Sequence, residues 1–258
     1  IAERSTGGVM GESAEKMAKL NGISRASQDA FTVRSHQQAA AALDTDGYGR
    51  EVSSVTVGEE TVDRDTLVRR DTSEEKLARL RPVFDAEGSL TAGNSCGLTD
   101  GASATLLMSE EKAKALGYTP LAAFRSWAYV GVDPREQLLM GPALSMPLAL
   151  ERAGMTLADA DLVDIHEAFA AQVLSVVSML ESDGFAKEKL GRDRAVGAVD
   201  PDRLNVYGGS ISLGHPFAAT GGRIIANAAK LLNEKGSGRA LISVCAAGGQ
   251  GVVAILEK

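Results

Sequence analysis

Short apolar runs alternate with helix-like segments through the second half of this 258-residue chain. The strand-like runs are Leu121–Val132, Leu162–Ile165, Asn205–Tyr207, Arg239–Val244 and Gly251–Leu256. The helix-like segments among them are Met146–Gly154, Ala168–Leu180 and Ala218–Asn233. Strands joined through helices need right-handed crossovers and a sheet that is covered on both faces. The pattern therefore predicts a layered α/β fold.

The first half of the chain opens with two expected helices within Met10–Leu43. The pair Asn21-Gly22 interrupts the helical pattern and is typical of a helix end. Ser13 and Ser24 are candidate N-caps, because a serine hydroxyl accepts a hydrogen bond from a free N–H of the first helical turn.

Short elements and turns follow before residue 120. Asp44–Arg50 (DTDGYGR) is a predicted loop, Val52–Val57 an exposed strand and Ser73–Leu80 a short charged helix. Gly101–Met108 (GASATLLM) combines small and apolar residues, which predicts a strand buried on both faces. We expect a linker near Gly117–Pro120.

Charge and cysteine usage exclude several classes of protein. The formal net charge is −7, and Lys and Arg are scattered rather than clustered, which argues against a nucleic-acid or membrane surface. No apolar run approaches the ~20 residues of a membrane helix. Cys96 and Cys245 lie in unrelated segments and lack the spacing of a zinc site or a disulfide framework. Free thiols favour a reducing, intracellular compartment.

Two glycine-rich turns carry the residues most suited to chemistry. Tyr207–Arg223 reads YGGSISLGHPFAATGGR and Val244–Gly251 reads VCAAGGQG, and each follows a strand-like run. Glycines allow a tight turn and the close approach of a bulky ligand. Each turn places an ionisable side chain among its glycines, His215 in the first and Cys245 in the second. Either residue alone is most often structural, but together they predict a proton-transfer site.

Four motifs in the same order resemble those of the thiolase family. They are NSCGLTDGASA at Asn94–Ala104, HEAFAAQ at His166–Gln172, and the two glycine turns that contain His215 and Cys245. Met10–His36 also resembles the loop domain of that family, so the resemblance covers nearly the whole chain. Most thiolases carry Asn where His166 stands. The HEAFA form is similar to the branch containing the thiolase (β) subunit of the fatty-acid β-oxidation trifunctional complex.

The resemblance implies a thiolase-like layered αβαβα fold, of which this chain would hold the C-terminal half and the loop domain. The implied divisions are a helical loop domain at 1–92, the last strand region of the N-terminal thiolase domain at 93–118, and the C-terminal thiolase domain at 119–258. The α/β core begins only after about 100 residues of loop-like and helical sequence, so we expect the chain to be the C-terminal part of a longer polypeptide.

The activity that the resemblance implies is thiolytic cleavage of 3-ketoacyl-CoA by CoA, giving acetyl-CoA and a shortened acyl-CoA. Coenzyme A would be a co-substrate, and neither a metal nor another cofactor is expected. Two alternatives stay open. One is biosynthetic acetoacetyl-CoA condensation on the same fold, and the other is a non-catalytic acyl-CoA-binding subunit that lacks the nucleophilic cysteine.

By the same resemblance, His215 is the base that activates the nucleophilic cysteine, and its ring would also help to hold the thioester oxygen. Gly214 helps to form the turn that aims this ring. An imidazole suits this role because it titrates near neutral pH. Cys245 would be the general acid/base that protonates the departing acetyl-CoA carbanion and then readies free CoA. The backbone N–H of Ala247 would be one donor of a second oxyanion hole, at a place where the usual residue is Gly.

Three further residues are assigned by resemblance. His166 would orient a water toward the thioester oxygen or donate to that oxygen directly, and its alternative is a structural histidine at a strand end. Cys96 stands on the segment along which pantetheine lies, and its alternative is an ordinary turn before a strand. Met10 would lie near the acyl pocket. His36, in contrast, is expected to be a surface histidine.

The remaining expectations concern what the chain works with. The family's nucleophilic cysteine belongs to an N-terminal segment with no match here, so we expect it upstream of this chain. The resemblance implies a homodimer or larger oligomer, and its branch implies docking on a hydratase/dehydrogenase subunit. The expected compartment is the cytoplasm, with the mitochondrial matrix as the alternative. No nucleic acid and no integral membrane segment are expected.

Overall fold

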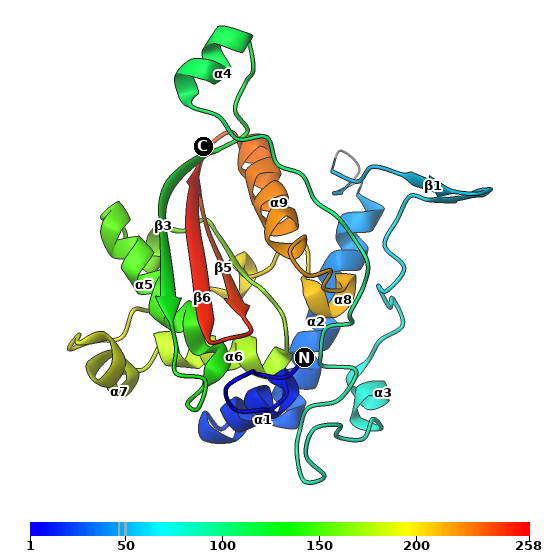
Figure 1. The fold of residues 1–258 in the computed structure, drawn as a ribbon, viewed down its shortest axis with the longest axis vertical. Coiled ribbons are helices and arrows are strands. Elements are labelled where there is room, and N and C mark those ends of the chain that lie inside the picture. The colour runs from blue at the N-terminus through cyan, green and yellow to red at the C-terminus, as the bar shows by residue number, and fades with distance from the viewer. Residues whose placement is uncertain (46, 49–50) are drawn as a thin grey trace.

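The computed structural model describes residues 1–45, 47–48 and 51–258 (Figure 1). A four-stranded sheet stands at its centre, in the order β3-β6-β5-β4. The strands are β3 (Ala123–Gly131), β4 (Leu162–Ile165), β5 (Arg239–Ala246) and β6 (Gln250–Glu257). β4 and β5 run parallel, whereas β6 is antiparallel to both β5 and β3.

Helices cover both faces of this sheet. The helices of this half are α5 (Gly141–Ala153), α6 (Ala170–Leu180), α7 (Asp183–Phe185), α8 (Ser210–Leu213) and α9 (Thr220–Lys235). Single helical turns occupy Leu138–Met140, Leu157–Asp159, Ala186–Leu190 and Pro201–Arg203. Figure 1 shows α5 on one side of the strands and α9 on the other. The predicted layered α/β fold is confirmed.

Alternating side chains explain why both faces are covered. Leu241 and Ile255 belong to the core that contains the buried residues of α5 and α6, whereas their neighbours Ile242 and Leu256 belong to the core under α9. Successive side chains of a strand point to opposite faces, so an apolar run buries both. The helix α5 lies especially close to β6: a Cβ on Gly141 would lie 2.5 Å from the Cα of Gly251.

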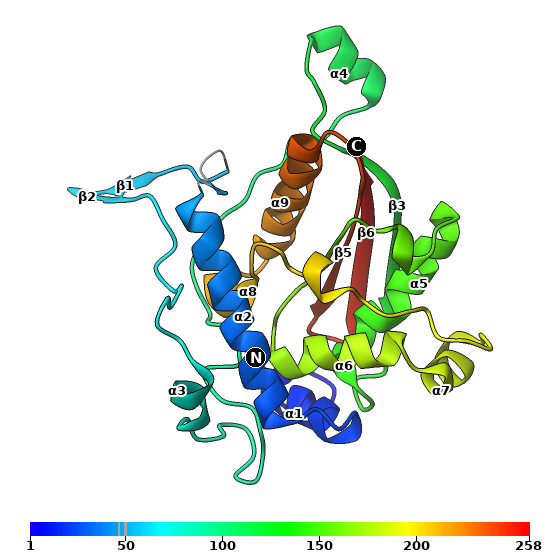
Figure 2. The same ribbon diagram turned by 180° about the vertical axis from the view of Figure 1, so that it is seen from behind.

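The first half of the chain wraps around one end and one side of this sheet. Its elements are α1 (Met10–Leu20), α2 (Arg25–Asp44), β1 (Val55–Val57), β2 (Glu60–Val62), α3 (Glu74–Ala78) and α4 (Glu110–Leu116). α1 packs against α6, and α2 packs against both α6 and α8. Figure 2 shows α2 beside α8, with the β1–β2 hairpin projecting away from the core.

The helix signals of this region are partly right. The Ser24 hydroxyl accepts the N–H of Ser27 at 3.1 Å and caps α2, as predicted. Ser13 is not a cap, because α1 begins at Met10 and the Glu12 carboxylate accepts the N–H of Val9 instead. The predicted loop at 44–50 includes residues 46 and 49–50, which lie outside the described residues, and its first residue, Asp44, ends α2.

Two predicted strands are not strands. Residues 101–107 are exposed and irregular, and within the described part of the chain no strand lies beside them to complete a hydrogen-bonded ladder. At the other site, Asn205 has a left-handed backbone, with φ of 47°. Its side chain takes the place of a strand neighbour, because the carboxamide accepts the N–H of Ile165 at 2.8 Å and donates to the Ile165 carbonyl at 3.0 Å.

The expected surface position of His36 is wrong. Its side chain is only 5% exposed, and its Nδ1 accepts the backbone N–H of Arg69 at 3.1 Å. Burial, together with the charge of Arg69, lowers the pKa of His36 to about 4. The residues around His36 are polar, which predicted an exposed helix. The helix α2 instead packs against α3, α6 and α8, and this packing buries His36.

The pairing of Asn205 with the end of β4 gives a stability prediction. Asn205→Ala removes two hydrogen bonds to Ile165 and one to Glu167, and leaves buried polar groups without partners. We expect the free energy of unfolding of the intact protein to fall by on the order of 3 kcal/mol in urea denaturation.

A second substitution at the same position separates the two causes. Asn205→Gly loses the same hydrogen bonds but tolerates the left-handed backbone, so it is expected to be about 1 kcal/mol less destabilising than Asn205→Ala. If both variants unfold at the wild-type urea concentration, the carboxamide does not hold this end of β4.

Candidate active site

The carboxyl ends of the parallel strands β4 and β5 bring His166 and Cys245 to one edge of the sheet. Ile165 pairs with Ser243, and the His166 N–H donates to the Ser243 carbonyl oxygen at 2.9 Å. Cys245 follows two residues later on β5, opposite Gly251 of β6. The carboxyl edge of parallel strands is the usual place for a ligand in an α/β sheet.

His215 reaches the same region from the loop between α8 and α9. Gly214 precedes it with φ of +89°, and a Cβ there would lie 2.5 Å from Thr99 Cγ2, so this position needs glycine. The backbone N–H of His215 donates to the Gly97 carbonyl oxygen at 2.8 Å. This bond fixes the turn at His215-Pro216 to the segment that carries Cys96.

The imidazole rings of His166 and His215 are in contact. Their centroids lie 4.3 Å apart, and the ring planes are inclined by 46°. His166 is 2% exposed, whereas His215 is partly exposed. The Nε2 atom of His166 is buried and has no hydrogen-bond partner in the described part of the chain. Two residues from separate motifs, 49 positions apart, thus form one pair.

Ser210 and Arg223 flank the ring of His166. The Ser210 hydroxyl lies 3.0 Å from His166 Nδ1, and Arg223 Nη2 donates to the same hydroxyl at 3.1 Å. Arg223 Nε and Nη1 are buried and have no partner among the described residues. Among the described residues this guanidinium thus has no hydrogen-bonded carboxylate, although its charge opposes the rise that burial causes in the pKa values of Asp164 and Glu167.

Thr220 holds the ring of His215. Its Oγ1 lies 2.7 Å from His215 Nδ1 and also donates to the Pro216 carbonyl oxygen at 3.2 Å. Sequence reasoning missed Ser210, Thr220 and Arg223, although all three belong to the glycine-rich stretch that carries His215. The available signal was the placement of hydroxyl side chains five residues before and five residues after that histidine.

Burial and positive charge keep both rings neutral. The pKa of His166 lies well below its ordinary value, because burial, the neighbouring His215 and the charge of Arg223 all disfavour the imidazolium. The pKa of His215 is also lowered, first by burial and then by Arg223. Neutral imidazoles can each offer one N–H and one lone pair, which is what proton transfer requires.

Both thiols of the site are protonated at neutral pH. Burial, with a smaller contribution from the nearby Cys96, raises the pKa of Cys245 to about 12. Burial also raises the pKa of Cys96, to about 11. Cys96 donates its backbone N–H to the Ala168 carbonyl oxygen at 3.0 Å, which keeps it beside the HEAFA segment. Direct contact between the Cys245 thiol and the His215 imidazole stays a prediction.

Glu167 anchors this arrangement. Its carboxylate is fully buried and accepts hydrogen bonds from the Ser35 hydroxyl at 2.7 Å, the Asn205 amide at 2.8 Å and the Ile211 N–H at 3.2 Å. Burial raises the pKa of Glu167, whereas these three hydrogen bonds oppose that rise. With its oxygens engaged, Glu167 is suited to orienting its neighbours.

Met10 and Ala247 occupy different environments. Met10 is partly buried at the start of α1 and packs against the core that contains Cys245 and Phe169. Ala247 is exposed in the turn between β5 and β6. Their predicted contacts with an acyl chain and an oxyanion stay predictions.

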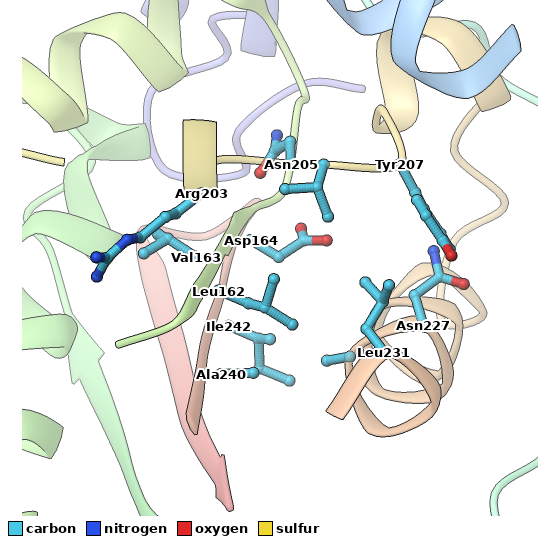
Figure 3. A pocket seen from close by; sticks show the side chains of 12 residues that line it. Leu162, Val163, Asp164, Arg203, Asn205, Tyr207, Asn227, Leu231, Ala240 and Ile242 are labelled. Carbon is cyan, nitrogen blue, oxygen red and sulfur yellow. The ribbon is translucent and has the colours of Figure 1, made fainter. Parts of the chain in front are cut away.

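A small cavity lies on the other face of β4. Asp164, Asn205, Tyr207 and Asn227 contribute polar groups to its lining, and Figure 3 shows the Asp164 carboxyl directed into the space between β4 and α9. Burial raises the pKa of this carboxyl to about 7. The catalytic candidates do not line this cavity.

Across the described residues, no cluster of His, Cys, Asp and Glu fits a metal ion, and no helix is long and apolar enough to span a membrane.

Family models match nearly the whole chain. Residues 118–258 match the model described as thiolase, C-terminal domain, and residues 1–111 match the model described as thiolase, N-terminal domain. The match therefore extends over both domains. The finer division at residues 92 and 118 stays a prediction.

Similar proteins carry thiolase names. The chain is 51% identical to the 3-ketoacyl-CoA thiolases of Yersinia pestis (strain Pestoides F) and Alteromonas mediterranea, over 100% of its own length and 60% of theirs. The chain thus spans less than two thirds of the length of these curated relatives.

Solved structures agree with the fold. The acetyl-CoA acetyltransferase of Bacillus anthracis matches with a TM-score of 0.87 and 35% identity, over 99% of this chain and 61% of that one. Human mitochondrial 3-ketoacyl-CoA thiolase matches with a TM-score of 0.84 and 32% identity, over 100% of this chain and 61% of that one.

The positive charge of Arg223 gives a prediction about the two rings. Arg223→Gln removes a positive charge that disfavours both imidazolium ions, so the pKa values of His166 and His215 are expected to rise. The measurement is an NMR titration of the intact protein with labelled histidines. Arg203→Gln is the matched control, because Arg203 is exposed and bonds the Ala158 and Ala160 carbonyls instead. Equal titration curves for wild type and Arg223→Gln would contradict this electrostatic account.

Proposed function

The chain belongs to the thiolase family, and from this premise we propose that it is part of a 3-ketoacyl-CoA thiolase. The enzyme would cleave 3-ketoacyl-CoA with CoA, giving acetyl-CoA and an acyl-CoA shortened by two carbons. Support comes from the relatives at 51% identity that carry this name. Coenzyme A acts as a co-substrate in this proposal.

The observation that carries the proposal is the contact of His166 with His215. The two neutral rings meet at the carboxyl edge of β4 and β5, and the Nε2 atom of His166 is buried without a partner. A structural histidine pair would satisfy its ring nitrogens within the protein, since unpaired buried polar atoms are costly. A ligand oxygen or an ordered water at this atom explains the arrangement.

His215 is the proposed base. If the Thr220 hydroxyl donates to the Pro216 carbonyl, its oxygen accepts the proton on His215 Nδ1, and Nε2 keeps its lone pair. That lone pair takes the proton of the attacking thiol. We expect this thiol on a part of the enzyme that the chain does not span, since Cys96 and Cys245 have other proposed places.

Carbon–carbon cleavage then proceeds from the 3-keto carbon. The thiolate adds to that carbon, the bond between the α and β carbons breaks, and its electron pair moves onto the acetyl-CoA fragment. His166 Nε2–H, or a water that it holds, stabilises the negative thioester oxygen. Stabilising this charge is the difficult part of the reaction. The backbone N–H of Ala247 is proposed as one donor of a second oxyanion hole.

Cys245 completes the cycle as acid and then base. Its buried thiol, with a pKa raised to about 12, protonates the far more basic carbanion. The resulting thiolate is strong enough to deprotonate CoA, because an ordinary thiol has a pKa of about 8.5. The CoA thiolate attacks the acyl-enzyme, and the enzyme thiolate leaves and recovers its proton from His215. Cys96 is proposed to lie along pantetheine, Gly214 to shape the turn beside it, and Met10 to border the acyl pocket.

Two other functions were weighed against this one. Biosynthetic acetoacetyl-CoA condensation uses the same chemistry in reverse, and the similarity to the Bacillus anthracis acetyl-CoA acetyltransferase favours it as the second candidate. A non-catalytic acyl-CoA-binding subunit would not need a neutral histidine pair beside a protonated buried thiol, so we rank it last.

The setting of the enzyme belongs to the same proposal. We place it in fatty-acid β-oxidation and in the cytoplasm, since the curated relatives named above are bacterial, with the mitochondrial matrix as the alternative. A homodimer or larger oligomer, which docks on a hydratase/dehydrogenase subunit, is the proposed assembly.

Substitution of the two central residues tests the proposal. In the intact protein, His215→Ala and Cys245→Ser are each expected to lower thiolysis by about 10²-fold to 10⁴-fold, because each removes a general acid or base. CoA binding is expected to persist. His166→Asn should change turnover only modestly, since the amide supplies another N–H, and Cys96→Ser serves as the matched thiol control. Unchanged turnover in either His215→Ala or Cys245→Ser would refute the assignment.

The lowered pKa of His215 also fixes the sign of a pH effect. The base must be neutral to accept a proton, so activity is retained above its pKa and lost as the pH falls through it. Because that pKa lies below 6.5, the acid limb of kcat/KM is expected below pH 6.5. An acid limb well above that pH would indicate another base.

A further inference from the structure

We propose that Ser210 and Arg223 are positioning residues that hold His166 in the tautomer with its proton on Nε2. In this tautomer the N–H points away from Ser210 and is available to the thioester oxygen of a bound acyl-CoA. The identity of the acceptor rests on the proposed function. The tautomer rests only on the hydrogen bonds around the ring.

Counting donors and acceptors gives the direction of each bond. Arg223 Nη2 carries only hydrogens to donate, so the Ser210 oxygen must be the acceptor of their 3.1 Å contact. The Ser210 hydroxyl then directs its own proton elsewhere. Its other recorded partner is His166 Nδ1 at 3.0 Å, which can take that proton only if it carries a lone pair. A neutral imidazole with a lone pair on Nδ1 has its proton on Nε2.

The neutral state of the ring is independently supported. His166 is 2% exposed, touches the ring of His215, and lies near the guanidinium of Arg223. In the described part of the chain, no carboxylate forms a hydrogen bond with its ring. The carboxylate of the adjacent residue, Glu167, bonds Ser35, Asn205 and Ile211 instead. An imidazolium here would gain no compensating negative partner and would lose its hydration.

In this tautomer the buried Nε2 of His166 is a hydrogen-bond donor. It lacks a partner among the described residues although the remainder of the ring is packed and bonded. A donor that is buried, oriented and unpaired meets the requirement for stabilising charge that develops on a ligand oxygen. His215 differs, because Thr220 favours the proton on its Nδ1 and leaves Nε2 as a base. Two identical side chains in contact thereby serve as one donor and one acceptor.

The first test reads the tautomer directly. The intact protein is prepared with ¹⁵N-labelled histidine, and the ring nitrogens of His166 are assigned by comparison with His166→Asn. We expect a pyridine-like signal from Nδ1 and a pyrrole-like signal from Nε2. In Ser210→Ala this preference is expected to weaken, giving mixed tautomers.

Ser212→Ala is the matched control. Ser212 lies two residues further along α8, is equally buried, and bonds the Gly209 carbonyl and Ser35 rather than a histidine ring. It should leave the His166 signals unchanged. Ser210→Thr retains the hydroxyl and is expected to restore the wild-type tautomer if the added methyl is accommodated.

The second test asks whether Ser210 acts through His166. With acetoacetyl-CoA and CoA as substrates, Ser210→Ala is expected to lower kcat by at least about tenfold, and by less than the roughly hundredfold loss of a whole oxyanion donor. The KM for CoA should stay near the wild-type value. In the His166→Asn background the same substitution should change kcat by less than about twofold, because the ring that it positions is gone.

The outcomes separate this inference from the proposed function. A His166 ring protonated on Nδ1, or on both nitrogens, in the wild-type protein overturns the inference whether or not the enzyme turns over. Equal losses of kcat from Ser210→Ala in the wild-type and His166→Asn backgrounds also overturn it. Absence of thiolysis in the wild-type protein, with the Nε2–H tautomer present, contradicts the proposed function and leaves the positioning role intact.

Discussion

The buried carboxylate of Glu167 is the interaction on which the site depends. Glu167 follows His166 directly in sequence, and its carboxylate joins three separate segments. It bonds α2 through Ser35, the irregular segment beside β4 through Asn205, and α8 through the N–H of Ile211. A desolvated carboxylate is costly unless hydrogen bonds replace its water, and here all three partners are themselves buried. The carboxyl end of β4 is thereby fixed to α8, the helix that begins with Ser210 and leads into Gly214 and His215.

This anchoring explains how two histidines from distant motifs stay in contact. Each ring has a different hydroxyl partner at Nδ1, a serine that also accepts from Arg223 and a threonine that also donates to a proline carbonyl. The same residue type therefore acquires opposite proton positions from its neighbours. The positive charge of Arg223 favours the neutral form of both rings. Burial and this positive charge favour neutral rings, and in the described part of the chain neither ring is hydrogen-bonded to a carboxylate.

The layered α/β class and most strands of the sheet could be predicted from the sequence, and the two motifs that carry His166 and His215 meet in the structure. The catalytic roles of these residues stay proposals. Leu162–Ile165 and the runs after Arg239 and Gly251 are apolar and bounded by glycine or charged residues, so local pattern was sufficient. The expected strand at Asn205–Tyr207 is wrong, because the side-chain carboxamide of Asn205 pairs with the backbone of Ile165 in place of a strand neighbour. Gly101–Met108 has strand composition but no strand beside it among the described residues. The hydrogen bonds made by Ser210, Thr220 and Arg223 could not be predicted. Their directions depend on how α8 and α9 pack beside β4, and the spacing of residues in the sequence does not specify that packing.

The most direct measurement is a crystal structure of the intact protein with acetoacetyl-CoA bound to a Cys245→Ser variant. The account predicts that the thioester oxygen lies about 3 Å from His166 Nε2, with the side chain of residue 245 facing the α carbon and His215 Nε2 facing the attacking thiol. A thioester bound elsewhere, or one whose oxygen has partners that do not include His166 or a water on its Nε2, would contradict it.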